Sequence, residues 1–281
     1  MARSPRRLRR GLSGITLLIV AAVGIGLYIA FRHVQPLLTG SGCEARSGRQ
    51  VITLSPGQAG IAATIAGVAD LKELPPRAVT VAYAAALQES KLTNLSYGDR
   101  DSVGVFQQRP SEGWGPRQKL IDPVYATTKF FDALTKVHNY VNLPVYKAAQ
   151  AVQHSADGLA YDQYEPLAKG LTTVFTGQHP HAVWCWYSGK IPARPQQQAI
   201  GAQLTRTFGP TTVLAAADPA VYVRVPNPLA GWAMAAWLVS HAQQYHVSGI
   251  SYGGYQWSAA SGSKGWIRDR SPVPAGQLKL G

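Results

Sequence analysis

Cysteine and acidic residues are scarce in this sequence. Its 281 residues include two cysteines, and 14 acidic residues stand against 27 lysines and arginines. Two cysteines are too few for a disulfide-dense scaffold, and 28 glycines without a period exclude a collagen-like chain. Only 15% of residues are charged and 46% are hydrophobic, which is not the composition of a disordered chain. The length therefore predicts one large or two medium folded domains.

The excess of positive charge is concentrated at the N-terminus. Residues 1–32 hold six arginines and no acidic residue, and the remainder carries a net charge of +7. Residues 11–31 are uncharged, and 21 helical residues at about 1.5 Å each can cross a hydrocarbon core of about 30 Å. We predict a cytoplasmic basic tail at 1–10, one transmembrane helix at 11–31 and an extracellular remainder, because arginine clusters stay on the cytoplasmic side.

A cleaved signal peptide is the alternative interpretation of this segment. Its apolar core is usually about 7–15 residues long and ends at a cleavage site of small residues. Here the apolar run is longer and ends at Ala30-Phe31-Arg32, without such a site. The pattern therefore favours an uncleaved anchor and a single-pass protein of the cell membrane.

An extracellular location changes the interpretation of the two cysteines. Cys43 and Cys185 form an even pair in an oxidising compartment, and a disulfide between them would close a loop over most of the first outer domain. Such a bridge contributes about 4–5 kcal/mol in the loop-entropy account. The alternative, a metal site with His179 and His181, has no recognised ligand spacing. We expect no metal and no cofactor.

The residues after the anchor divide by composition. We expect a polar stalk at 32–50, a mainly α-helical domain at 51–177, a linker at 178–198 rich in proline and aromatic residues, and a small α+β domain at 199–281. Capping and apolar periodicity predict helices from Ser55-Pro56, over 76–90, 122–134, 145–153 and 159–174, and later over 196–208 and 228–245. Short strands are expected at 221–225 and around 250–252, 265–267 and 277–280.

The stretch AYAAALQESKLTNLSYGDRDSVGVFQQRPSEGWG contains the residues with the most specific chemistry. It places Glu89 at the end of an apolar helix, followed by a polar loop and then Gly104-Val105-Phe106-Gln107-Gln108. A carboxyl group held against apolar walls can remain protonated near neutral pH and act as an acid. Cleavage of a glycosidic bond needs such a proton on the leaving sugar oxygen.

These residues resemble a known family. Glu89-Ser90 followed by Gly104, Phe106 and Gln107 resembles the first two motifs of the lysozyme-like lytic transglycosylases, the Glu-Ser pair and the Gly-x-x-Gln turn. A longer run, from about 43 to 176 and including GDRDS, FQQRPSEGWG and DPVYATTKFFDAL, resembles lysozyme-like domains of cell-surface proteins in high-GC Gram-positive bacteria. The resemblance implies a lysozyme-like fold for the mainly α domain.

The resemblance also implies a substrate and residue roles. The substrate would be a peptidoglycan glycan strand, cleaved between N-acetylmuramic acid and N-acetylglucosamine with Glu89 as general acid and base. A transglycosylase needs no second carboxylate, because the substrate's own hydroxyl closes a 1,6-anhydro ring. A hydrolase would need one, and Asp99 and Asp101 are the candidates. The candidate substrate-binding residues are Ser90, Gly104, Gln107, Gln108, Trp114, Gln153 and Tyr161.

One departure from the family pattern leaves the activity open. The third motif of these transglycosylases is Ala-Tyr-Asn, and the corresponding region here reads Ala151-Val152-Gln153-His154-Ser155. Gln153 could donate in place of the Asn, and Tyr161 or Tyr164 could supply the aromatic wall. The alternative function is therefore a catalytically inactive lysozyme-like protein that binds peptidoglycan or acts as a scaffold.

In the 199–281 domain, the stretch GWAMAAWLVSHAQQYHVSGISYGGYQWS, followed by SGSKGWIRD, weakly resembles a C-terminal domain of related cell-wall proteins, akin to the fold of zinc D-Ala-D-Ala peptidases. Such enzymes need a closing His-x-His, but no histidine follows Tyr252, and His241 and His246 would lie about 140° apart around a helix. We expect this domain to pack, bind or position rather than hold zinc. Nucleic-acid binding is not expected either, because the domains are expected outside the cell and the sequence has no basic helix or binding motif.

Overall fold

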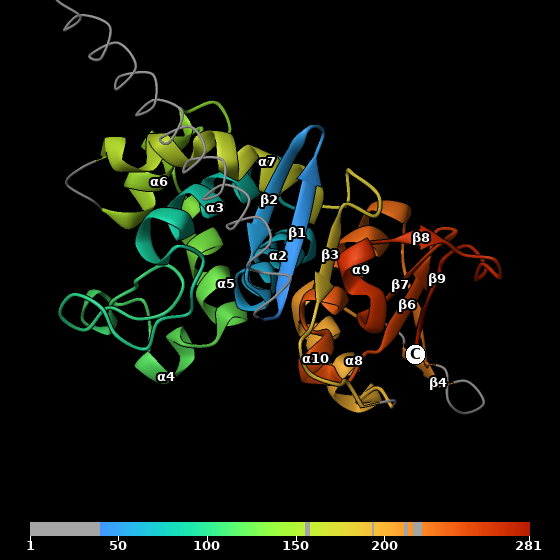
Figure 1. Cartoon of the computed structure of the whole chain (residues 1–281). Helices are drawn as coiled ribbons and strands as arrows, with labels where there is room; N and C mark the ends of the chain where they lie inside the picture. The colour runs from blue at the N-terminus through green and yellow to red at the C-terminus, as the bar shows by residue number, and fades with distance from the viewer. Residues whose placement is uncertain (1–39, 155–157, 193, 211–212, 216–220) are drawn as a thin grey trace, which may run out of the picture. The chain divides into compact units, whose positions relative to one another are not determined.

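The computed structural model describes residues 40–154, 158–192, 194–210, 213–215 and 221–281 (Figure 1). About half of the described residues are helical, and the strands form small antiparallel sheets. The expected basic tail and transmembrane helix lie outside the described residues, and among those described no helix is long and apolar enough to span a membrane. Residues Gly42–Gly281 form one compact unit.

The first part of this unit is helical, as the caps in the sequence predict. Ser55 and Gln58 form a reciprocal capping box at the start of α2, and the Asp122 side chain accepts a hydrogen bond from Val124 N at the start of α5. The helix expected over 159–174 is divided at Glu165, where a 3₁₀ segment gives way to an α-helix. The elements are α2 (Pro56–Leu71), α3 (Pro76–Ser90), η1 (Pro110–Glu112), α4 (Arg117–Leu120), α5 (Pro123–Leu134), α6 (Val145–Gln153), η2 (Gly158–Tyr164) and α7 (Glu165–Phe175).

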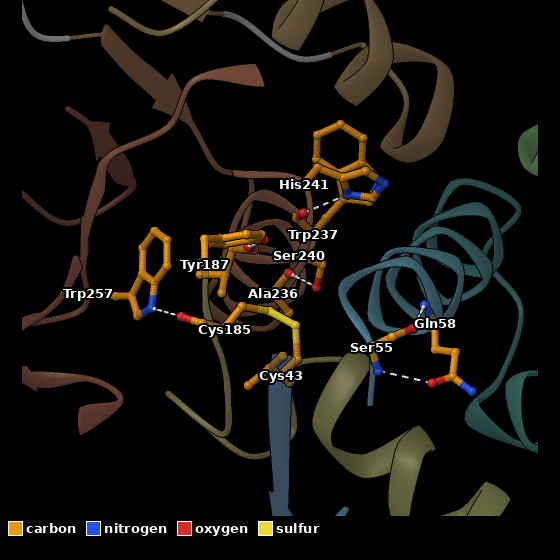
Figure 2. Close-up of a disulfide and its surroundings, with 12 residues drawn as sticks. Cys43, Ser55, Gln58, Cys185, Tyr187, Ala236, Trp237, Ser240, His241 and Trp257 are labelled. Carbon is orange, nitrogen blue, oxygen red and sulfur yellow. Dashed lines mark hydrogen bonds between the residues drawn. A yellow bond between two sulfur atoms is a disulfide. The ribbon is translucent and has the colours of Figure 1, made fainter. Parts of the chain in front are cut away.

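A three-stranded antiparallel sheet holds the disulfide. Strand β1 (Gly42–Ser47) lies between β2 (Gln50–Leu54) and β3 (Val183–Trp186), and Cys43 faces Cys185 across the β1–β3 pair. The two sulfurs are bonded, which confirms the predicted bridge (Figure 2). Strand β1 lies within the segment expected to be a stalk, and β3 lies within the expected linker. The polar composition of the expected stalk and the prolines of the expected linker did not indicate strands. Pairing of β1 with β3 brings the two segments into one sheet.

The second part combines four helical segments with a six-stranded antiparallel sheet of order β4-β5-β9-β6-β7-β8. The predicted strands near 221, 250, 267 and 277 are all present, and the helix expected over 228–245 has a break at His241. The elements are α8 (Gln197–Phe208), β4 (Val213–Ala215), β5 (Val221–Arg224), α9 (Pro228–Ser240), α10 (Ala242–Tyr245), β6 (Gly249–Tyr252), β7 (Tyr255–Ser258), η3 (Ala259–Lys264), β8 (Ile267–Arg268) and β9 (Gln277–Leu280).

One hydrophobic core continues through both parts. Helix α2 consists largely of small residues and packs against α9 of the second part, so the two helices approach closely. A side chain at Gly60 would come within 2.9 Å of Nε2 of His241, which stacks on Trp237 at a centroid distance of 4.1 Å. Trp237 in turn donates from Nε1 to Oγ1 of Thr64 at 3.2 Å. The α2–α9 contact therefore joins the helical part to the six-stranded sheet.

We predict that reduction of the disulfide destabilises the protein. The bonded cysteines are 142 residues apart, so the bridge removes much of the conformational freedom of the unfolded chain. The double variant Cys43→Ser/Cys185→Ser should lose about 4–5 kcal/mol in the free energy of unfolding, measured by urea denaturation of the full chain. Reductant should lower the wild-type midpoint and leave that of the variant unchanged. Equal midpoints for reduced and oxidised wild type would contradict the prediction.

The stability of the α2–α9 contact should depend on pH through His241. Burial lowers the pKa of His241 from 6.5 to about 4. Between these values the unfolded chain binds a proton that the folded chain does not, so stability is full above pH 6.5 and falls as the pH drops toward 4. We expect a loss of roughly 2–3 kcal/mol across this window.

The check is the free energy of unfolding at several pH values between 4 and 7. The slope should persist in the exposed-histidine control His138→Gln and should be largely absent in His241→Phe. A slope in His241→Phe equal to that of wild type would assign the effect to other groups.

Candidate functional site

Glu89 lies at the C-terminal end of a helix that is buried along most of its length. Residues Ala78–Leu87 of α3 are buried, while Glu89 is partly exposed. The helix stops at Lys91, whose backbone is left-handed with φ of +56° and whose N–H bonds to carbonyls of the last turn. A buried helix that ends in this way holds the Glu89 carboxyl at a defined position on the surface of the core.

The turn over 104–108 is attached directly to this helix end. Ser90 Oγ donates to the carbonyl of Val105 at 2.7 Å. Gly104 has φ of +80°, and a Cβ there would lie 2.4 Å from the carbonyl oxygen of Leu120, so only glycine fits. Val103 and Gln108 form a β-bridge across the turn, and Gln107 has a left-handed backbone with φ of +47°. The turn therefore presents the side chain of Gln107 beside the helix end.

A cavity of about 620 Å³ opens where these segments meet, and we call it the Glu89 cavity. It brings together seven of the residues predicted from the sequence: Glu89, Asp99, Gln107, Gln108, Trp114, Gln153 and Tyr161. Four further residues line it that were not expected there: Ser102, Arg109, Glu112 and His154.

Hydrogen bonds tie three separate segments together around the Glu89 carboxyl. The hydroxyl of Tyr161, in η2, donates to Glu89 Oε1 at 2.7 Å. Nε2 of Gln153, at the end of α6, donates to the carbonyl of Phe106 at 2.8 Å. Helices α3 and α6 are in contact, and Figure 1 shows them side by side. Tyr161 of η2 thus holds the carboxyl that α3 carries, and the 104–108 turn beside it is bonded to both α3 and α6.

Two glutamines of the turn differ in how they are held. Gln107 is partly exposed, and its Nε2 donates to the carbonyls of Tyr97 at 3.3 Å and Gly104 at 3.1 Å. Gln108 is buried, and its Nε2 donates to the carbonyl of Ala126 at 3.3 Å. Within the described residues, Oε1 of Gln108 has no partner. Gln107 stabilises the turn, and Gln108 adds an unused acceptor to the cavity wall.

The two candidate second carboxylates have different surroundings. Asp99 lines the cavity, and one of its oxygens bonds to Nη2 of Arg109 at 2.9 Å. Asp101 does not line it; its carboxylate accepts from Ser111 N at 2.8 Å and from Ser111 Oγ at 2.9 Å. The hydrogen bond from the Ser111 backbone is the main reason that the pKa of Asp101 is lowered. Asp101 therefore acts as an anchor of the loop, as do Ser90 and Gly104, which also lie outside the cavity lining.

Arg109 organises the rim of the cavity. Besides Asp99, it contacts Glu112 at 2.8 Å and donates from Nε to Ser102 Oγ at 3.1 Å. The hydrogen bond to Glu112 is the largest cause of the raised pKa of Arg109, which remains a cation. The Arg109–Glu112 ion pair could have been predicted from one feature of the sequence, the spacing of three residues. Residues three apart in a helical turn are neighbours.

The arrangement can bind a polar ligand and supply one positioned carboxyl. Amide, hydroxyl and indole groups line the cavity, and the carboxyl of Glu89 is held by a neutral phenol rather than by a cation. No group of three His, Cys, Asp or Glu side chains that could hold a metal occurs in the part of the chain that the structure describes. Glu89 is the carboxyl that a neighbouring hydroxyl positions, and it can act as an acid and base in a cavity that Asp99, Glu112 and Arg109 also line.

We predict that Asp101 controls the order of the loop at the cavity rim. Asp101→Ala removes both acceptors used by Ser111, so amide exchange across 102–112 should accelerate by about fivefold in hydrogen-exchange mass spectrometry. Asp162→Ala, at an exposed aspartate outside the cavity, is the control and should leave this segment unchanged. Because the pKa of Asp101 is lowered, its contribution is complete above pH 3.8 and is lost as the pH falls through the lowered value. Unchanged exchange in Asp101→Ala would contradict this assignment.

Comparisons with known proteins do not assign this chain to a family. No protein-family model matches the chain, and no curated protein matches it. A functional conclusion therefore has to come from the residues of the Glu89 cavity themselves.

Proposed function

We propose that this chain is a membrane-anchored, extracellular protein that cleaves peptidoglycan, with a lysozyme-like fold in its helical part. The observation that carries the proposal is the Glu89 carboxyl, bonded to the Tyr161 hydroxyl at 2.7 Å in a polar cavity of about 620 Å³. The bond cleaved would be the glycosidic bond between N-acetylmuramic acid and N-acetylglucosamine. The motif resemblance of Glu89-Ser90 and the 104–107 turn supports this choice of substrate.

In the proposed reaction Glu89 acts twice. Its carboxyl first donates a proton to the oxygen of the leaving sugar, and the carboxylate then accepts a proton from the group that attacks the anomeric carbon. Tyr161 occupies Oε1, and among the described residues Oε2 has no hydrogen-bond partner. Oε2 is therefore the oxygen that is free to exchange the proton with substrate. Gln108 Oε1 supplies an acceptor for a substrate hydroxyl or amide N–H.

The surroundings of Asp99 favour a lytic transglycosylase over a hydrolase. A hydrolase needs a second carboxylate as nucleophile or as base for water. Asp99 is paired with Arg109, and Asp101 is held by Ser111 outside the cavity lining. A transglycosylase avoids this requirement, because the 6-hydroxyl of the muramic acid attacks the anomeric carbon and its proton passes to Glu89. The products would carry a 1,6-anhydro ring.

The proposed location has one support from the structure. The Cys43–Cys185 bridge joins paired strands, and disulfides form and persist in oxidising compartments such as the cell exterior. The arginines before residue 11 and the uncharged run at 11–31 also support an exterior location. The part of the chain after the anchor would then lie on the same side of the membrane as peptidoglycan.

The test is incubation of the full chain, in mild detergent, with purified peptidoglycan, with soluble products identified by mass spectrometry. We expect wild type to release anhydro-muropeptides. Glu89→Gln keeps the shape but removes the titrating proton, so release should fall at least about 100-fold. Glu73→Gln replaces an exposed glutamate away from the cavity and should behave as wild type.

Other outcomes of this test select different functions. Products with ordinary reducing ends that require Glu89 would identify a hydrolase and direct attention to Asp99. No release by wild type, together with co-sedimentation of the protein with peptidoglycan, would overturn the catalytic proposal. It would leave the alternative, an inactive lysozyme-like protein that binds the wall, for which the substituted third motif at 151–155 is the sequence observation.

A further inference from the structure

A second cavity lies in the sheet region, away from the residues of the Glu89 cavity. Its volume is about 550 Å³, and we call it the Trp184 cavity. It is formed by the β1–β2 turn, the segment between α7 and β3, strand β3 itself and the end of η3. Its lining residues come from both parts of the chain, which meet at β3.

The lining of the Trp184 cavity is aromatic and cationic. Two indoles, Trp184 and Trp266, share it with the side chains of Arg46 and Lys264, and no acidic residue lines it. The guanidinium of Arg46 lies over the Trp184 ring, 5.2 Å from its centroid. The Glu89 cavity has the opposite character, with three carboxylates and one guanidinium. The charged side chains that line the Trp184 cavity are therefore cationic.

Arg268 is a further cation near the cavity, and it reaches the lining residue His181 through Tyr255. His181, which lines the cavity, stacks on Tyr255 at a centroid distance of 4.1 Å, and the guanidinium of Arg268 lies 4.6 Å from the centroid of the same Tyr255 ring. Burial lowers the pKa of His181, and the charge of Arg268 lowers it further. Both effects favour the uncharged imidazole of His181, which can form hydrogen bonds with a ligand.

Hydrogen bonds to backbone carbonyls hold the walls of this cavity. Arg46 N donates to the carbonyl of Ala182 at 2.8 Å, and Trp266 Nε1 donates to the carbonyl of Val183 at 2.7 Å. Gly265 lets the chain pass against Trp184, because a Cβ there would lie 3.2 Å from the indole. The cavity is therefore formed before any ligand enters, which reduces the cost of ordering it on binding.

One polar group of the lining is buried without a partner. Trp184 is 8% exposed, and its Nε1–H has no hydrogen-bond acceptor among the residues for which the structure gives positions. Buried indole N–H groups are ordinarily bonded, and an unpaired one costs free energy. An acceptor oxygen from a ligand would satisfy it. Aromatic walls, flanking cations and an unused donor together describe a site for a ligand with an apolar face and anionic oxygens.

We propose that the Trp184 cavity binds an anionic saccharide, meaning a sugar or polyol unit that carries a carboxylate or a phosphate. The indoles would contact the C–H face of the sugar, and Arg46 and Lys264 would pair with the anionic group. The preference for an anion rests on the cavity alone, whereas the choice of a saccharide rests on the proposed function. In a cell wall the anion has two sources, the carboxylate of a muramic acid unit and the phosphate of a polyol-phosphate polymer.

The test is isothermal titration calorimetry on the full chain carrying Glu89→Gln, so that binding is measured without cleavage. The probes are peptidoglycan fragments that contain muramic acid, poly(glycerol phosphate) and neutral chitotetraose. Arg46→Gln and Lys264→Gln should each weaken binding of one anionic probe by about tenfold, and the probe affected identifies the source. Arg49→Gln and Lys190→Gln, at exposed cations outside the cavity, should leave it unchanged. Chitotetraose binding should be equal in all variants.

Three results would overturn the proposal. They are failure of both anionic probes to bind, equal loss in the cavity variants and the control variants, and equal loss of chitotetraose binding. Failure of both anionic probes to bind would mean that the cavity is not a site for an anionic saccharide. Equal loss in the cavity variants and the control variants would mean that binding depends only on the overall charge of the protein. None of them depends on cleavage of peptidoglycan, so failure of this inference and failure of the proposed function are distinguished.

Discussion

The disulfide between Cys43 and Cys185 is the constraint on which the rest of the structure depends. It joins the two strands at the ends of a segment that contains every helix around the Glu89 cavity. Strand β3 is also where the second part is attached, since Trp257 Nε1 donates to the carbonyl of Cys185 at 3.0 Å (Figure 2). A Cβ at Gly262 would lie 2.1 Å from the same oxygen, so η3 rests directly on the strand. The β1–β3 pair therefore forms part of the Trp184 cavity, and its disulfide joins the ends of the segment that forms the Glu89 cavity.

The Glu89 cavity separates residues that face a ligand from residues that hold the walls. Glu89, Tyr161 and Gln153 bring three segments together, while Ser90 and Asp101 fix the loops from behind. The polar groups that hold the walls form hydrogen bonds with other groups of the protein. Those left over, Oε2 of Glu89 and Oε1 of Gln108, are the atoms on which the chemistry proposed for the cavity relies.

Local signals in the sequence predicted the helices, and the motif resemblance indicated most of the residues that line the Glu89 cavity. The Ser55 and Asp122 caps marked helix starts correctly, because a cap is a contact between near neighbours in the chain. Strands β1 and β3 were not predicted as one sheet, because their pairing joins segments about 140 residues apart. Arg109 was missed for a similar reason, since its role depends on how the loop that carries Asp99 folds. Where a residue's environment is made by distant segments, composition and periodicity carry no information about it.

The left-handed backbone at Gln107 and His154 lowers the stability of the fold, and these two residues keep side chains in the Glu89 cavity. Both have φ near +50°, and both line the Glu89 cavity. A residue with a Cβ in this conformation costs about 1 kcal/mol relative to glycine. Glycine at either position would relieve that strain but remove a side chain from the cavity wall. The chain therefore tolerates a local loss of stability at these two positions, and it retains there an amide and an imidazole that glycine could not provide.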